Sequence, residues 1–262
     1  RGGFSATNYK VCTRSQRLAV LKVCNSYSLQ EVEEQAACQA QLARTARADA
    51  QVCSPFALAA QQQTGTAAGA QDERFAAQTS DGVPALLVSF VPGRAADRVL
   101  EGGEVEPKAL LHAIGRQLAQ LHGVALPPPP QQPQLRSYER AGCCLLGGHV
   151  KGIYLQKFSE AMPEHAFVEF YRPRQKELAR LLEEEQPPQG IVHGDAFLDN
   201  VLVQLDEGGA IASCVLVDYE DVCVGPLIFD LACCASGSCF EAKTNQLQLP
   251  WVEALLVSGL SC

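Results

Sequence analysis

One short stretch limits the folds open to this 262-residue chain more than any other feature. In residues 191–203, two apolar runs of strand character enclose a tight polar loop that contains Asp195 and Asn200. A further apolar run ends at Asp218, and the sequences Gly-Pro-Leu and Asp-Leu-Ala follow it. Each of these residues alone is most often a turn or capping residue. An ordinary loop does not explain all of them in this order, so the set indicates a functional site.

The residue types and their spacing fit the transfer of a phosphoryl group from ATP. That reaction requires an acceptor for the proton of a hydroxyl group and oxygen ligands that hold Mg²⁺ against the phosphates. Asp195 and Asn200 can divide these two tasks on one tight loop, with the carboxylate facing the hydroxyl and the amide oxygen facing the metal. Asp218, at the end of an apolar strand, adds the hard anionic ligand that Mg²⁺ prefers. We therefore expect ATP and Mg²⁺ as cofactors.

The same loop resembles the catalytic loop of the aminoglycoside phosphotransferase and choline kinase superfamily, a branch of the protein-kinase-like fold. Phe197, residues 199–202 and residues 233–240 are similar to the homoserine kinase group. Choline kinases instead favour Asn-Asp where this chain has Gly194-Asp195. The resemblance implies an α+β, two-lobed protein-kinase-like fold, with a small β-rich N-terminal lobe and a larger helical C-terminal lobe.

The resemblance also implies roles for individual residues of the loop and its surroundings. Asp195 would be the catalytic base, and Asn200 and Asp218 would be the metal ligands. His193 would orient the loop, and Asp230 would be a structural anchor. A general-base role for His193 is the alternative, although the side chain at this position of the motif normally packs and bonds to the backbone.

The beginning of the chain carries a second resemblance to the same superfamily. Residues 2–11 are similar to its strand-turn-strand that covers the phosphates, in which Gly3 lets backbone N–H groups approach an anion and Asn8 belongs to the motif. A simple turn is the alternative for the Gly-Gly pair. Lys22, in the run 20–23, resembles the cation that contacts the α- and β-phosphates; an exposed edge-strand lysine is the alternative.

Lys22 would need a carboxylate from the following helix to hold it extended. Glu34 is the expected partner, because it falls where that helix becomes rich in alanine and turns inward. Glu31 and Glu33 compete for this role, and two of the three carboxylates are expected to face solvent.

Three further positions follow from the resemblance and from their order in the chain. Ser89 and Val91 belong to a strand followed by Pro-Gly that would act as the hinge, with backbone groups pairing with adenine. His122 ends a Leu-Ala-Gln-Leu-His sequence and is expected to be a packed structural residue. Residues 220–221, Glu-Asp, can contact a substrate ammonium group or form a solvated charge pair.

Periodicity and turn residues predict the secondary structure around these motifs. Ser28 and Glu31 have capping-box spacing at the start of a helix. The expected elements are a hairpin of 8–13 and 17–24, a helix to about 47, a loop over 61–81, a strand over 83–91, a helix carrying an apolar stripe from 110 to 121, a stiff linker at 127–130, a helix over 163–185, and strands at 191–192, 201–203 and 214–217. We expect an N-terminal nucleotide-binding lobe of residues 1–91 and a catalytic lobe of residues 92–262.

Composition excludes several classes of protein. The net charge of −8 disfavours nucleic acid polymers as partners, because phosphate backbones require a basic face. The 12 cysteines lack C-x-x-C spacing and lie largely in apolar runs, which favours reduced, buried thiols over disulfides or a zinc site. No apolar stretch is long enough to cross a membrane. These features predict a cytoplasmic protein; an organellar location stays open because the chain starts at Arg1. Oligomeric state is not readable from the sequence.

The acceptor is the least constrained part of the prediction. The expected substrate is the hydroxyl group of a small metabolite, and homoserine is the best single choice. Hydroxylysine, choline-like alcohols and aminoglycoside-like sugars are alternatives within the class. Homoserine kinases usually continue through further helices, whereas this chain ends at Cys262, so a C-terminally truncated protein is expected. A non-catalytic nucleotide-binding protein is the alternative from another class.

Overall fold

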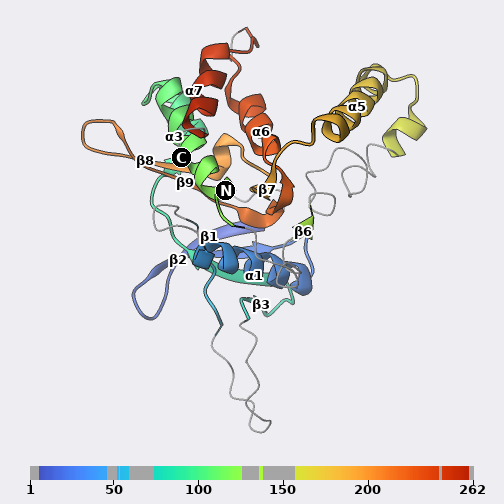
Figure 1. Cartoon of the computed structure of the whole chain (residues 1–262). Coiled ribbons are helices and arrows are strands. Elements are labelled where there is room, and N and C mark those ends of the chain that lie inside the picture. Colours follow the sequence, from blue (N-terminus) through green and yellow to red (C-terminus); the bar gives the residue numbers. More distant parts are fainter. Residues whose placement is uncertain are drawn as a thin grey trace.

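The computed structural model describes residues 6–45, 52, 54–58, 74–125, 136–137, 157–241 and 244–259. Within these ranges the chain forms a sheet with one long helix, and above it a larger region rich in helices (Figure 1). This arrangement is the α+β, two-lobed architecture expected from the sequence.

The smaller lobe is a four-stranded antiparallel sheet with one helix packed on it. Its strand order is β1-β2-β4-β3, and every neighbouring pair is antiparallel. The elements are β1 (Ala6–Cys12), β2 (Leu18–Cys24), α1 (Leu29–Thr45), β3 (Ala76–Gln78) and β4 (Pro84–Ser89). The predicted hairpin, the first helix and the strand before the hinge are thereby confirmed.

The start of α1 follows the local chemistry of its sequence. The Ser28 N–H donates to the Glu31 carboxylate at 2.7 Å, and the Glu31 N–H donates back to the Ser28 hydroxyl at 3.3 Å. This reciprocal pair is the predicted capping box, which satisfies N–H groups that have no partner inside the helix.

Strand β3 corrects the predicted loop over residues 61–81. Residues 59–73 lie outside the described part, but Ala76–Gln78 pairs with β4. The Glu33 carboxylate on α1 accepts the N–H groups of Phe75 and Ala76 at 2.9 and 2.7 Å. Because this short strand is supported by a helix that is distant in the sequence, the composition of residues 76–78 does not predict it.

The larger lobe combines helices with two small sheets, ordered β6-β10-β7 and β5-β8-β9. The predicted short strands around the polar loop are confirmed as β7, β8 and β9. The elements are β5 (Arg94–Ala95), α2 (Ala96–Glu101), α3 (Pro107–His122), β6 (Arg136–Ser137), α5 (Ala166–Glu185), β7 (Gln189–Val192), η1 (Leu198–Asn200), β8 (Val201–Leu205), β9 (Ile211–Leu216), η2 (Tyr219–Asp221), β10 (Cys223–Pro226), α6 (Ile228–Ser238) and α7 (Leu249–Gly259).

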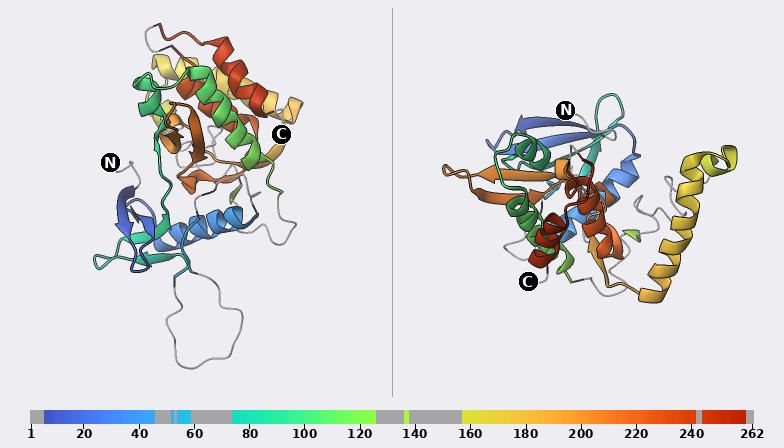
Figure 2. Two further views of the ribbon diagram at one scale, coloured as in Figure 1. Left: turned by 90° about the vertical axis from the view of Figure 1, so that its left-hand side faces the viewer. Right: turned by 90° about the horizontal axis from the view of Figure 1, so that it is seen from above.

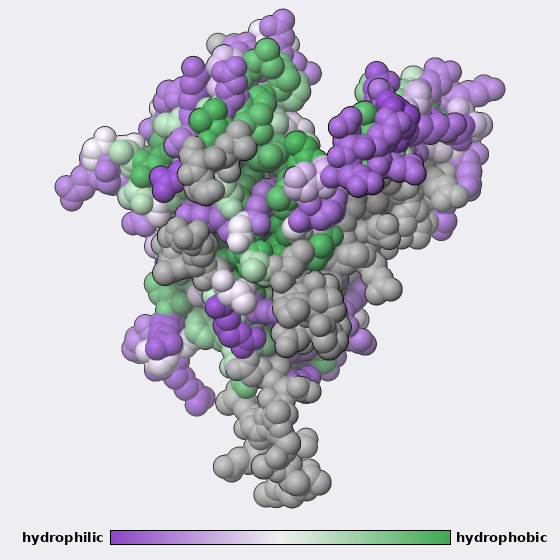
Figure 3. Space-filling model, viewed as in Figure 1, coloured by the Kyte–Doolittle hydropathy of each residue, from purple (hydrophilic) through white to green (hydrophobic). Residues whose placement is uncertain are grey.

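Helix α3 forms the centre of this lobe. Its predicted apolar stripe is fully buried, and α7 lies along it (Figure 2). Helix α5, predicted from residue 163 and observed from Ala166, projects from the body and buries only Val168. Apolar side chains gather over α6 and α7 on the outer surface (Figure 3). Ile228 on α6 and Leu249 and Val257 on α7 are exposed apolar residues of these helices.

The described cysteines are all free thiols, as expected, and most of them are buried. Cys12 corrects the expectation of burial because it is exposed, and Cys233 is half-buried. Burial raises the pKa of Cys214 and of Cys234 to about 12, so both stay protonated at neutral pH. The doublet at 143–144 and the predicted linker at 127–130 lie outside the described residues. None of the helices in the described ranges has the length and hydrophobicity of a bilayer-spanning segment.

Truncating the buried stripe of α3 tests its place in the core. Leu118 is completely buried, whereas Leu178 on α5 is 41% exposed. We expect Leu118→Ala to lower the free energy of unfolding by about 2–5 kcal/mol, because it removes buried methyl groups and leaves a cavity. Leu178→Ala is the matched control, with a loss below about 1 kcal/mol. Urea denaturation measures both, and similar losses in the two variants would contradict this packing.

Candidate active site

The loop between β7 and β8 is anchored by the buried carboxylate of Asp230. Asp230 on α6 has no exposed surface and accepts the backbone N–H groups of His193 and Gly194 at 2.7 and 3.0 Å. Its third contact is the ring Nε2 of His122, 2.9 Å away at the end of α3. These bonds compensate the cost of burying the charge. They confirm the expected anchoring role of Asp230 and the structural role of His122.

Gly194 is required by the shape of the loop. Its φ is +84°, and a Cβ atom at this position would lie 2.3 Å from the carbonyl oxygen of Asp221. The loop therefore packs against the segment after β9 with no room for a side chain. This close approach brings two motifs together that are far apart in the sequence.

His193 is also fully buried and bonds to the backbone on both sides. Its Nδ1 accepts the Asp195 N–H at 3.3 Å, so the ring proton lies on Nε2, which donates to the Val217 carbonyl at 2.9 Å. The ring also packs against Tyr219. Because both ring nitrogens are engaged within the protein, this geometry supports the orienting role of His193 rather than the general-base alternative.

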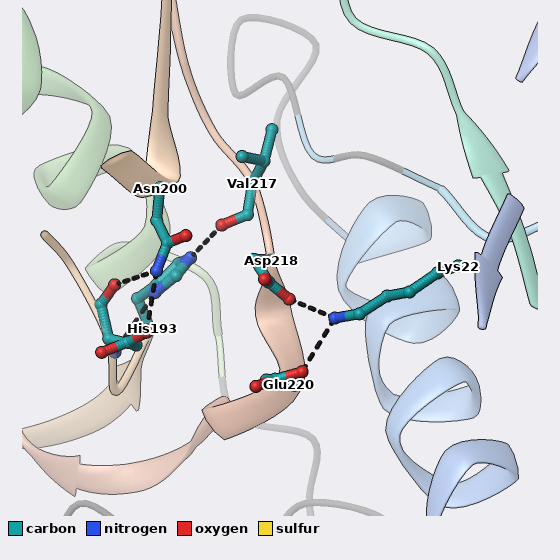
Figure 4. A network of polar contacts seen from close by, with 7 residues as sticks. Lys22, His193, Asn200, Val217, Asp218 and Glu220 are labelled. Carbon is teal, nitrogen blue, oxygen red and sulfur yellow. Dashed lines mark hydrogen bonds and ion pairs between the residues drawn. The ribbon is translucent and has the colours of Figure 1, made fainter. Parts of the chain in front are cut away.

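Asp195 and Asn200 are joined directly. The Asn200 amide nitrogen donates to the backbone carbonyl of Asp195 at 3.0 Å and to its carboxylate at 2.8 Å. Since the nitrogen faces Asp195, the amide oxygen of Asn200 faces the opposite side (Figure 4). The amide can therefore orient the carboxylate with one end and ligate a cation with the other.

Asp218 follows β9 with a left-handed backbone, at φ 67° and ψ 61°. Aspartate is among the few residues that tolerate this conformation, which is frequent at functional sites. Its carboxylate contacts the Lys22 ammonium group, which reaches across from β2 (Figure 4). Lys22 also donates to the Glu220 carboxylate at 2.8 Å.

The charge of Lys22 is strongly favoured in this setting. Burial disfavours it, but the carboxylates of Asp218 and Glu220 outweigh that effect and raise the Lys22 pKa above its usual value. Lys22 is thus a permanently charged group that links the two lobes. This bridge excludes the reading of Lys22 as a freely exposed edge-strand lysine.

The expected pairing of Lys22 with Glu34 is wrong in this structure. Glu34 is exposed and accepts a hydrogen bond from Gln30 at 3.0 Å. Glu31 serves the capping box, and Glu33 binds the start of β3. The reason is the rotation of α1, which turns other positions of the helix toward the site.

A cavity of about 360 Å³ lies between the lobes at this point. Its size is at the lower end of the usual range for small-molecule sites. Six of the predicted site residues line it, namely Asn8, Lys22, Ser89, Val91, Asn200 and Asp218. The sequence did not single out Gln35, Ala36 and Gln39, which line it from α1. Their helical spacing places them on one face, but only packing decides which face.

The predicted contacts with the nucleotide include Gly3 and Ser89. Gly3 lies outside the described residues. The Ser89 N–H already donates to the Ser54 carbonyl at 2.9 Å, so it is not free to pair with a base. The Ser89 carbonyl and the Val91 backbone are the hinge groups left for that role.

The donor set suits magnesium better than zinc. Among the described residues no cluster of three or more His, Cys, Asp and Glu side chains can hold a metal. The cavity is instead lined by Asp218, which has a carboxylate, and by Asn200, which has an amide oxygen. Two hard oxygen donors are what Mg²⁺ takes from a protein when substrate phosphates and water complete its shell.

Sequence comparison places these features in a known group. Residues 1–255 match the phosphotransferase enzyme family. A homoserine kinase of Methylobacterium nodulans is 32% identical over 165 residues, which are 61% of this chain and 43% of that kinase. A homoserine kinase of Gluconobacter oxydans is 29% identical over 184 residues, covering 67% of this chain and 49% of the relative. The matches thus span less than half the length of these relatives.

Comparison with solved structures identifies the fold. An ethanolamine kinase of Plasmodium vivax aligns with 97% of this chain and 68% of its own, at a TM-score of 0.56 and 13% identity. An ADP-bound aminoglycoside phosphotransferase aligns over the whole chain and 76% of its own, at a TM-score of 0.55 and 12% identity. At these identities the likeness supports the fold alone, which is the expected protein-kinase-like one.

Adding one methyl group at Gly194 tests the packing of the loop. Gly194→Ala is expected to misplace Asp195 and Asn200, because the new Cβ atom meets the Asp221 carbonyl. Gly209→Ala is the matched control, since Gly209 has φ +80° but open space around its Cβ position. The control carries only the backbone strain, about 1–2 kcal/mol. Thermal unfolding and phosphotransfer assays compare the two; equal stability and equal activity would refute the close approach.

Proposed function

Because the chain belongs to the phosphotransferase enzyme family, we propose that it transfers the γ-phosphoryl group of ATP to the hydroxyl group of a small metabolite, with Mg²⁺. The observation that carries the proposal is the bond between Asp195 and Asn200 at the edge of a cavity that also contains Asp218 and Lys22. Phosphoryl transfer depends mainly on positioning and charge, and these four side chains supply both.

In the proposed reaction Asp195 accepts the proton of the substrate hydroxyl. The hydroxyl oxygen forms a bond to the γ-phosphorus, the bond between that phosphorus and the β–γ bridging oxygen breaks, and ADP leaves. Asn200 holds the Asp195 carboxylate in place through the 2.8 Å hydrogen bond. Lys22 supplies a fixed positive charge for the phosphates, which carry negative charge throughout.

Asn200 and Asp218 are the residues proposed to hold Mg²⁺. A bound Mg²⁺ would neutralise phosphate charge during transfer. Their oxygens fit this ion because carboxylate and amide oxygens are hard ligands. Asp218 contacts Lys22 in the structure, so it would exchange this contact in part for the metal.

The nucleotide is proposed to bind across the cavity between the lobes. Val20, Val88 and Leu202 offer apolar contacts for a base, and the hinge residues Ser89 and Val91 lie at the same cavity. Asn8 on β1 stands opposite Lys22 on β2 in the sheet register and lines the cavity as well. The boundary between nucleotide-binding and catalytic lobes stays proposed at residues 91 and 92.

Homoserine is the proposed acceptor. The curated relatives that support it are homoserine kinases, six of which are 26% to 32% identical over 164 to 184 residues. Of the predicted pair at residues 220–221, Asp221 is the carboxylate proposed to face an acceptor ammonium group, because Glu220 already pairs with Lys22. The matched part is less than half of those kinases, so a panel of amino alcohols and sugars is the appropriate assay.

The removal of the proposed base separates catalysis from binding. We expect Asp195→Asn to lower the rate of ADP release with homoserine by about 100-fold or more, which is typical for the loss of a general base. Binding of MgATP, measured by thermal shift, is expected to persist because Asn200, Asp218 and Lys22 are unchanged. Asp81→Asn, in the exposed turn before β4, is the control. Full activity of Asp195→Asn would disprove the assignment of the base.

A further inference from the structure

The counter-charges of Lys22 come from the segment after β9 and not, as the sequence predicts, from α1. Lys22 lies between the carboxylates of Asp218 and Glu220, which belong to one short segment after β9 (Figure 4). The side chains of Lys22 and Glu220 are only 13% and 14% exposed. An ion pair so poorly screened by water has a larger electrostatic effect than one on the surface.

Helix α1 also lies beside Lys22 (Figure 4), and none of its three glutamates pairs with the lysine. Each of them has another described partner: Ser28 for Glu31, the start of β3 for Glu33, and Gln30 for Glu34. Within the described part of α1, the residues that line the cavity together with Lys22 are Gln35, Ala36 and Gln39, and none of them carries a charge. A glutamine offers no charge to balance a lysine.

The hydrogen bonding of Gln35 also argues against α1 as the source of the counter-ion of Lys22. Its Nε2 atom is buried and has no hydrogen-bond partner among the described residues. Buried polar atoms are nearly always satisfied, and an unsatisfied one in a cavity points to a missing partner such as a ligand or water. Gln35 is therefore open to a ligand in the cavity, and the counter-ion role stays with the segment of Asp218 and Glu220.

The two carboxylates cannot be equivalent when a nucleotide is bound. Asp218 is the proposed ligand of Mg²⁺, and a metal ion withdraws its charge from Lys22. Glu220 is then the carboxylate left to Lys22 among its partners in the structure. A lysine buried to this degree would otherwise lose the compensation that keeps it extended toward the cavity.

We propose that Glu220 is the positioning residue of Lys22 in the nucleotide-bound protein, in place of a carboxylate on α1. This inference rests on the proposed function, because it takes Asp218 as the metal ligand. It also explains the spacing Asp-Tyr-Glu at residues 218–220, which puts the metal ligand and the lysine holder on one short helical turn.

The first test compares two glutamates by the same substitution. Glu220→Gln keeps the shape of the side chain and removes its charge, and Asp218 still compensates Lys22 in the ligand-free protein. We expect MgATP to bind about 5-fold or more weakly, because the lysine is no longer held. Glu34→Gln, the control, is expected to bind MgATP like the parent chain. Parental affinity in Glu220→Gln, or an equal loss in Glu34→Gln, overturns the proposal.

The second test moves the carboxylate to the helix. Gln35→Glu places a charge on the face of α1 that shares the cavity with Lys22. In this background Glu220 becomes dispensable, so Glu220→Gln is expected to change MgATP affinity less than about 2-fold, against about 5-fold in the parent. This rescue separates positioning from a purely structural role, which would give the same loss in both backgrounds. Equal losses overturn the proposal.

The readout distinguishes this inference from the proposed function. Both tests measure MgATP binding by isothermal titration on the full chain, so they need no acceptor. If the parent binds MgATP but transfers no phosphate to any acceptor, the proposed function fails while the role of Glu220 is still decided. If the parent does not bind MgATP, the inference is overturned as well.

Discussion

The geometry of the site depends on one buried carboxylate. Asp230 receives two backbone N–H groups from the loop after β7 and the ring of His122 from α3. A buried charge is tolerated only where its hydrogen bonds are made, so these donors must stay in place. The loop is thereby fixed to the helical core, and every polar side chain that it carries inherits a defined position.

A second constraint links the two lobes. Lys22 stands on the central strand pair of the small lobe, and its partners Asp218 and Glu220 stand on the larger one. The bridge crosses the cavity in which a nucleotide is proposed to bind. The anchored loop and the bridging lysine thus meet at one place, where Asn200 and Asp218 are the proposed metal ligands and Asp195 is the proposed base.

Much of this could be predicted from the sequence, for physical reasons that differ by residue. The stripe from Leu110 to Leu121 has the period of a helix, and Ser28 with Glu31 forms a cap within one turn. The loop of residues 193–200 can be predicted as a candidate site because its polar residues are close together in the chain. Strand β3 was missed because its support comes from Glu33 on another element.

The sequence by itself determined which residue types the proposed site contains: the order of Asp195, Asn200 and Asp218, and the lysine before the first helix. It also indicated the two-lobed architecture that carries them. Only the tertiary structure decided which residues from distant parts of the chain lie together. Glu34 follows Lys22 at a plausible distance along the chain, yet the rotation of α1 turns it outward and brings Gln35 to the cavity. Glu220, 198 residues away, holds the lysine instead. Local sequence patterns predict that a helix forms, whereas packing against the rest of the molecule decides which of its faces is buried.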